Sequence, residues 1–208
     1  MKSLNSKYLL ESLQADLRQL MLTATYLQKE DPEILLAAPG EGRWSVAQVL
    51  EHLNSYGRYY LPAIARSLSA DRPAKERFQP GWIGNYFTSI MKPGADGRIP
   101  HKMSAPKNHR PAAGLDIKPV LDNFLKQQEE LIGLLELAKQ KDIGALRTPV
   151  SISRFIKLKT GDTFRFLIAH EQRHFLQIAH TVRDLRTATG KFQSTPPATQ
   201  RSPVFLHG

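Results

Sequence analysis

The sequence predicts an all-α protein, a four-helix bundle of up-down-down-up order with a long crossover between its second and third helices. Four long segments place apolar residues three, four and seven positions apart, the spacing that gives a helix one buried face. The second and third segments are separated by about 45 residues rich in Pro and Gly, far more than a hairpin loop needs. That length can return the chain to the other end of a bundle, so we expect these two helices to run parallel.

The composition favours one globular domain without disulfides or a membrane span. The 208 residues suffice for one core, and the absence of cysteine excludes disulfides and thiolate metal sites. No apolar run approaches about 18 residues, and the N-terminal residues are too polar for a secretory signal. We therefore expect a cytoplasmic protein with no membrane partner. Its single domain should cover residues 1–188, followed by a flexible tail at 189–208.

Half of the net charge of +10 lies in the crossover, residues 71–115. Between Asp71 and Gly114, eight Lys and Arg residues stand against three acidic residues. A solvated loop is the simplest interpretation, attraction of an anionic substrate is a second, and nucleic-acid binding is a third. The third is disfavoured, because no nucleic-acid-binding motif or array of stacking aromatic residues accompanies the charge.

The first two helices have clear boundaries in the sequence. The first is predicted from about Leu4 to Lys29, where apolar residues follow a heptad-like pattern, and it ends before Pro32. The second begins after Ser45, which forms a capping box with Gln48 three residues later. This helix carries its apolar stripe into the bundle core.

The crossover and the third helix come next. A short helix is predicted at Trp82–Met91, whose large apolar side chains are close enough together to pack on a neighbouring element. The third helix starts at 116–119, with proline tolerated in its first turn. Residues 147–159 contain spaced apolar residues and are predicted to be briefly extended.

The fourth helix, predicted at Thr160–Leu185, carries a pair of histidines. Thr160 is expected to cap its first turn, and Asp162 places a negative charge near the positive end of the helix dipole. His170 and His174 lie one turn apart at the margin of the apolar face. Two imidazoles at this spacing point the same way and can bind one metal ion.

A third histidine, His52, lies beside the apolar stripe of the second helix. A single histidine in such a position is usually a hydrogen-bonded core or surface residue. Three imidazoles on a four-helix scaffold supply the protein ligands of a catalytic type of metal site and leave one position open. Water bound there can ionise near pH ~7 and become a nucleophile.

Two motifs resemble the DinB/YfiT-like superfamily, in particular its DinB_2 branch. They are GRWSVAQVLEHL at 42–53 and DTFRFLIAHEQRHFLQI at 162–178. The resemblance covers about residues 4–186 and implies a similar four-helix bundle. It further implies a divalent ion, often zinc or nickel, held by His52, His170 and His174. Through its characterised relatives, the resemblance implies thiol-dependent transferase or isomerase activity. It also implies a homodimer formed through a bundle face.

Glu171 falls near the centre of the apolar face of the fourth helix. A carboxylate in that position has to be paired or close to the metal. Three roles are open: accepting a hydrogen bond from a ligand imidazole, acting as a general base, or forming a salt bridge to a neighbouring helix.

Tyr56, Arg173 and Gln177 are the candidate substrate-binding residues. Tyr56, one turn after His52, either lines a pocket or packs in the core. Arg173 and Gln177 flank the histidine pair, and Arg173 could hold an anionic substrate.

Three further histidines are expected to lie away from the site. His180 points about 80° away from His170 on the helical wheel and is predicted to be exposed. His101 and His109 lie in the crossover and could reach the metal only if that loop folds over it.

Two functions remain open on these observations. In one, the metal site activates water, as in a hydrolase, or a small thiol, as in an S-transferase, against a small-molecule substrate that is anionic or itself a thiol. In the other, the bundle is a non-catalytic, stress-related protein that binds a metal or a small ligand.

Overall fold

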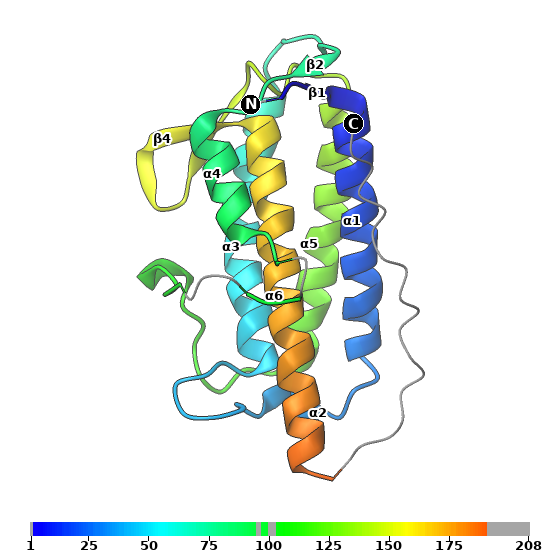
Figure 1. Ribbon diagram of the computed structural model, residues 1–208, viewed down its shortest axis with the longest axis vertical. Coiled ribbons are helices and arrows are strands. Elements are labelled where there is room, and N and C mark those ends of the chain that lie inside the picture. The colour runs from blue at the N-terminus through cyan, green and yellow to red at the C-terminus, as the bar shows by residue number, and fades with distance from the viewer. Residues whose placement is uncertain (1, 95–96, 100–102, 191–208) are drawn as a thin grey trace.

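The computed structural model describes residues 2–94, 97–99 and 103–190, and over these residues the chain forms a bundle of four long helices (Figure 1). The all-α four-helix bundle predicted from the sequence is confirmed. The long helices are α1 (Ser6–Leu27), α3 (Val46–Leu68), α5 (Ile117–Ala138) and α6 (Thr160–Ala188). The shorter elements are α2 (Pro32–Leu36), α4 (Trp82–Met91), the 3₁₀ turn η1 (Lys107–His109), β1 (Leu4–Asn5), β2 (Arg77–Phe78), β3 (Arg147–Val150) and β4 (Ser153–Lys159). The predicted tail lies outside the described residues from 191 onward.

Hydrogen bonds at the helix ends define the directions of the long helices. The Ser6 backbone N donates to the Glu76 carbonyl at 2.8 Å, so α1 starts beside the segment that leaves α3. Ser67 Oγ, at the end of α3, donates to the Arg147 carbonyl at 2.9 Å, in the hairpin that joins α5 to α6. Both α1 and α6 therefore begin at the end of the bundle where α3 and α5 finish, and α3 runs parallel to α5 (Figure 1).

The short helix α4 has the predicted bounds, and it packs against α6. Its contact face contains Gly84, where an added Cβ would lie 2.4 Å from Asp162 Cβ. The expected packing of its large apolar side chains does not extend to Trp82 and Tyr86, which are 71% and 54% exposed. So close a helix contact requires the small residue, and the large side chains on the opposite face remain in solvent.

Two helix starts were predicted from capping residues, and one of them is correct. Ser45 and Gln48 form the full capping box, with reciprocal bonds of 3.2 and 3.0 Å. Thr160 does not cap α6, because β4 continues directly into the helix and Lys159 occupies the cap position without a side-chain bond. The Thr160 hydroxyl instead lies 3.1 Å from Thr148 Oγ1 in β3.

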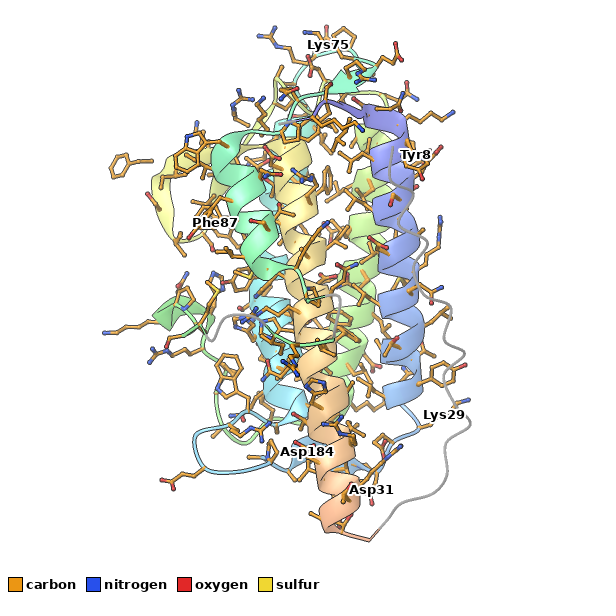
Figure 2. All side chains as sticks on the ribbon, in the orientation of Figure 1. Tyr8, Lys29, Asp31, Lys75, Phe87 and Asp184 are labelled. Carbon is orange, nitrogen blue, oxygen red and sulfur yellow. The ribbon has the colours of Figure 1, made fainter. Side chains whose placement is uncertain are left out.

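The remaining elements close the ends of the bundle. Residues 147–159, predicted to be extended, form the antiparallel β3–β4 hairpin. Apolar side chains of the four long helices fill one continuous core, while Tyr8, Lys29 and Lys75 lie at the periphery (Figure 2). None of the helices in the described part of the chain has both the length and the apolar character that a membrane span requires.

Candidate metal centre

Three imidazoles meet inside the bundle, one from α3 and two from α6. His52 projects from α3, and His170 and His174 project from the same face of α6, one turn apart. One ring nitrogen from each lies within 4.8 Å of the other two. His170 Nε2 is 3.3 Å from His52 Nε2 and 3.0 Å from His174 Nε2. The structure thus brings the three predicted ligands together.

Oxygen atoms behind two of the rings define their tautomers. His52 Nδ1 is 2.7 Å from the His109 backbone carbonyl, and His174 Nδ1 is 3.0 Å from Gln177 Oε1. Because a carbonyl oxygen can only accept, His52 and His174 carry their protons on Nδ1 and direct the Nε2 lone pairs to the centre. Such bonds orient metal-binding histidines. Within the described residues, His170 Nδ1 has no hydrogen-bond partner.

Burial keeps the three imidazoles neutral. Loss of hydration is the main cause that lowers the pKa of His52, of His170 and of His174, the last to about 3. Three neutral rings whose lone pairs converge repel one another unless a proton or a cation lies between them. The donor set fits a divalent cation that accepts imidazole, and three protein ligands leave a further coordination position open.

His109 belongs to the surroundings of the centre, whereas the sequence placed it away from the site unless the crossover folds over it. Its ring is buried, with its centroid 3.9 Å from that of Tyr56, and its Nδ1 is 2.8 Å from Ser55 Oγ. Burial is the main cause that lowers the pKa of His109 to about 4. No spacing rule connects a loop residue to position 52, so the sequence holds no signal for this contact. His101 lies outside the described residues.

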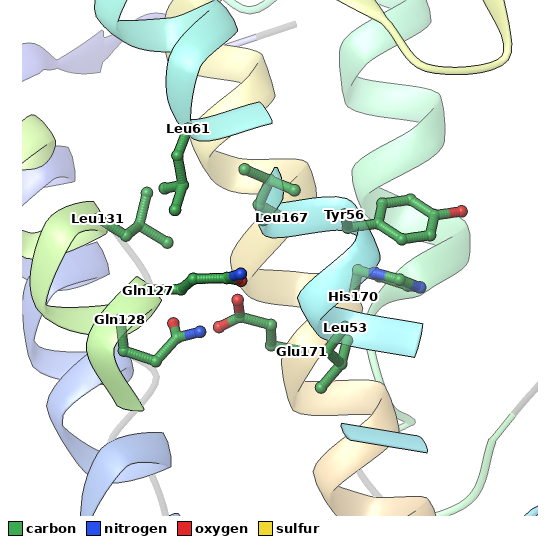
Figure 3. Close-up of a pocket in the computed structure, with 10 residues that line it drawn as sticks. Leu53, Tyr56, Leu61, Gln127, Gln128, Leu131, Leu167, His170 and Glu171 are labelled. Carbon is green, nitrogen blue, oxygen red and sulfur yellow. The ribbon is translucent and has the colours of Figure 1, made fainter. Parts of the chain in front are cut away.

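Glu171 points away from His170, toward Gln127 and Gln128 of α5 (Figure 3). In the amide orientation that satisfies both side chains, Gln128 Nε2 lies 3.1 and 3.2 Å from its carboxylate oxygens. Within the described residues the carboxylate therefore meets Gln128 rather than an imidazole or a basic side chain, and its catalytic role stays a prediction. Neighbouring positions differ by about 100° around a helix, which turns Glu171 away from His170. Burial raises the pKa of Glu171 to about 8.

The three predicted substrate-binding residues border a cavity of about 850 Å³ that reaches the histidines. They are Tyr56, Arg173 and Gln177. Tyr56 lines the cavity and is also 7% exposed, within the core, and its role in substrate binding stays a prediction. His180, predicted to be exposed, is half-buried.

Comparison of the sequence with models of protein families shows to which family the chain belongs. The model of the DinB superfamily matches residues 10–178, which include all three histidines. The chain belongs to the DinB superfamily. The resemblance predicted from the two motifs is therefore confirmed, and the matched DinB region extends from α1 through most of α6.

One solved structure can be compared with this DinB superfamily chain. It is YfiT from Bacillus subtilis, described as a probable metal-dependent hydrolase with an unusual four-helix bundle topology. The two chains are 16% identical, and the alignment covers 86% of this chain and 85% of that chain with a TM-score of 0.45. A search of curated proteins finds no match.

Proposed function

We propose that the protein is a metal-dependent enzyme in which His52, His170 and His174 hold one divalent ion, with zinc or nickel as the expected metal. The convergence of three buried Nε2 atoms supports this proposal most directly. An ion held by three imidazoles supplies Lewis acidity and can lower the pKa of a bound water to about 7.

The protein residues prepare this chemistry in two ways. The His109 carbonyl and Gln177 orient two of the rings, so that the donor nitrogens face inward before any ligand arrives. The adjoining cavity has the volume of a small-molecule site and opens onto the same rings. This arrangement suits an activated nucleophile, either water in a hydrolase or a small thiol in an S-transferase.

Metal analysis is the first test. Protein purified without a histidine tag should carry, or take up, about one zinc or nickel ion per chain, measured by elemental mass spectrometry. His174→Ala should lose this ion because it removes one of three donors. His180→Ala is the matched control, since it alters another histidine of α6 outside the cluster. If the wild-type protein takes up no metal, the proposal is wrong.

Activity on the metal-loaded protein is the second test. Panels of esters and amides would report hydrolysis, and thiol consumption with electrophilic acceptors would report transfer. We expect turnover that is lost with a chelator and in His174→Ala but kept in His180→Ala. Stoichiometric metal without turnover in either panel would favour the non-catalytic binding protein instead. A homodimer and a cytoplasmic location stay predictions, the first testable by light scattering.

A further inference from the structure

The cavity beside the histidines is large enough to select a substrate by its shape and charge. Its volume of about 850 Å³ lies within the usual range for small-molecule sites. The chemistry of its wall changes along α6, which contributes residues from Phe166 to Gln177. The three imidazoles lie between the two ends of this wall.

The end nearer the start of α6 is apolar. The ring centroid of Phe166, one turn before His170, is 6.3 Å from that of Phe87 in α4 and 6.1 Å from that of Tyr60 in α3. Ile152, in the turn of the β3–β4 hairpin, lines the same cavity and is 57% exposed. Together these residues offer an apolar surface on one side of the histidines.

The opposite end carries positive charge. Arg173 follows Phe166 by seven residues, which places it about 10 Å further along the helix axis. Arg43 also lines the cavity, and its Nη1 is 3.9 Å from the Asp184 carboxylate near the end of α6. Figure 2 shows Phe87 and Asp184 at well-separated levels along the long axis of the molecule.

A third arginine extends this cationic end. Arg110, the residue after His109, also lines the cavity. Two residues later, the Ala112 carbonyl accepts a hydrogen bond from Gln48 Nε2, which places this stretch near the start of α3. No Asp or Glu is among the described residues that line the cavity. Guanidinium groups gathered at one end of a cavity can form a site for an anion, because they bind oxyanions in a bidentate manner.

We propose, resting on the function proposed above, that the substrate is an amphipathic organic anion. Its apolar acyl or aryl part would lie against Phe166 and Ile152, its carboxylate or phosphate group would lie at Arg173, and its reacting bond would lie between them at the histidines. About 6 Å of helix separates Phe166 from His170, and about 4.5 Å separates His170 from Arg173. A chain of roughly eight carbons with one anionic end matches this span.

Four probes separate the two recognition elements. Octanoate and octyl phosphate carry both elements, octanol carries only the apolar chain, and butanoate carries the charge with a short chain. Isothermal titration calorimetry on the zinc-loaded protein should show that octanoate or octyl phosphate binds at least tenfold more tightly than octanol and butanoate. The stronger of the two octyl anions identifies the headgroup. Equal affinity for octanol and the anions would overturn the assignment of charge.

Two variants locate the recognition elements. Arg173→Gln should weaken the better octyl anion about tenfold or more, whereas Arg183→Gln, an exposed arginine of the same helix, should leave it unchanged. Ile152→Ser should weaken the octyl anion several-fold but not butanoate, with the exposed Leu22→Ser as its control. Circular dichroism and the melting temperature of each variant would verify its fold. Unchanged affinity in a folded Arg173→Gln would contradict the proposal.

The same titrations on chelator-treated protein exclude direct coordination. A carboxylate could bind the metal itself, in which case chelation would abolish binding and Arg173→Gln would have no effect, and the proposed site would be wrong. Retained binding that depends on Arg173 supports it. If no amphiphile binds while the zinc stoichiometry of the wild-type protein and its loss in His174→Ala hold, only this inference fails. Loss of metal binding would instead refute the proposed function.

Discussion

The imidazole of His52 depends on a group from outside the four long helices. The His109 carbonyl accepts its Nδ1 proton at 2.7 Å, and the buried His109 ring is itself held by Tyr56 and Ser55. Any side chain at position 109 keeps the carbonyl, but only a ring that fills this pocket holds the carbonyl in place. His109 is therefore a positioning residue for the candidate centre.

His109→Ala should weaken metal binding without abolishing it. Outer hydrogen-bond partners of metal ligands typically contribute 10- to 100-fold in affinity, and we expect about tenfold because the carbonyl remains. Competition with a chromophoric chelator would measure the affinity for zinc. Asn108→Ala is the matched control, since Asn108 is exposed in the same 3₁₀ turn. Equal affinities in both variants would show that the ring has no positioning role.

The buried carboxyl of Glu171 should lower the folding stability as the pH rises. Burial raises the pKa of this carboxyl to about 8 from its ordinary value of 4.5. Below pH 4.5 the carboxyl is protonated in both folded and unfolded chains, and its ionisation contributes nothing. As the pH rises from 4.5 to about 8, the unfolded chain ionises and the folded one does not, so folding stability is lost. Over the whole range the loss is up to about 5 kcal/mol.

Glu171→Gln should remove this loss, because glutamine imitates the neutral acid beside Gln128. In metal-free protein, the variant should match the wild type near pH 4.5 and exceed its free energy of unfolding by several kcal/mol at pH 8. Urea unfolding at four pH values would measure the difference. A constant difference across these pH values would show that Glu171 is ionised in the folded protein.

At the scale of elements, the contact between α4 and α6 depends on one glycine. An added Cβ at Gly84 would lie 2.4 Å from Asp162 Cβ and 2.5 Å from its Cγ. Asp162 cannot easily move, because it accepts bonds from the Gly81 backbone N at 2.7 Å and from Arg165 at 2.9 Å. The two helices therefore have to separate if position 84 gains a side chain.

Gly84→Ala should destabilise the fold by about 1–3 kcal/mol, the usual effect of overpacking. Gly133→Ala is the matched control, since Gly133 lies on the exposed face of α5 with no atom within 4 Å of the added Cβ. That substitution should stabilise the helix by up to about 1 kcal/mol. Urea midpoints at unchanged m values would measure both, and equal signs would contradict the proposed contact.

Elements with local signals were predictable from the sequence, and those defined by distant partners were not. The long helices follow from apolar periodicity, and Ser45 with Gln48 marks a start correctly because both caps lie within four residues. Thr160 is also a residue type that caps helices, but β4 continues directly into α6 and the Thr160 hydroxyl lies 3.1 Å from Thr148 Oγ1. A local rule cannot anticipate this competition.

The residues of the candidate centre also divide into those with a local sequence signal and those placed by distant partners. His170 and His174 were predictable because the turn of one helix fixes their spacing, and His52 because the fold brings the edge of its apolar stripe to α6. The direction of Glu171 depends on how α6 is rotated against α5, where Gln128 lies. His109 depends on the path of a long crossover, which no periodicity describes.

At the scale of the whole molecule, the metal should stabilise the fold. An ion that binds only the folded chain adds about 2.7 kcal/mol when its free concentration is 100 times its Kd. For a chain of this size that corresponds to a rise in melting temperature of roughly 5–10 °C. Differential scanning fluorimetry with zinc should show this rise in the wild type and in His180→Ala, with little of it in His174→Ala.

The pH dependence of this stabilisation reports on burial of the histidines. In metal-free protein, the contribution of the buried histidines to stability is complete above pH 6.5, where imidazoles are neutral in both folded and unfolded chains. As the pH falls below 6.5, the histidines of the unfolded chain bind protons. In the folded chain they stay neutral until the pH approaches their lowered pKa values, about 4 for His109 and about 3 for His174, so folding stability is lost. Each such histidine removes up to about 1.4 kcal/mol per pH unit.

The folded site, however, remains deprotonated across that range, so protons compete poorly with the metal. We therefore expect the zinc-induced increment in the free energy of unfolding to change little between pH 7 and pH 6, even while the contribution of the buried histidines falls. A surface site of histidines with ordinary pKa values of about 6.5 would lose affinity over the same interval. Urea unfolding with and without zinc at both pH values distinguishes the two cases, and a steep fall of the increment would show that the three rings are accessible to protons.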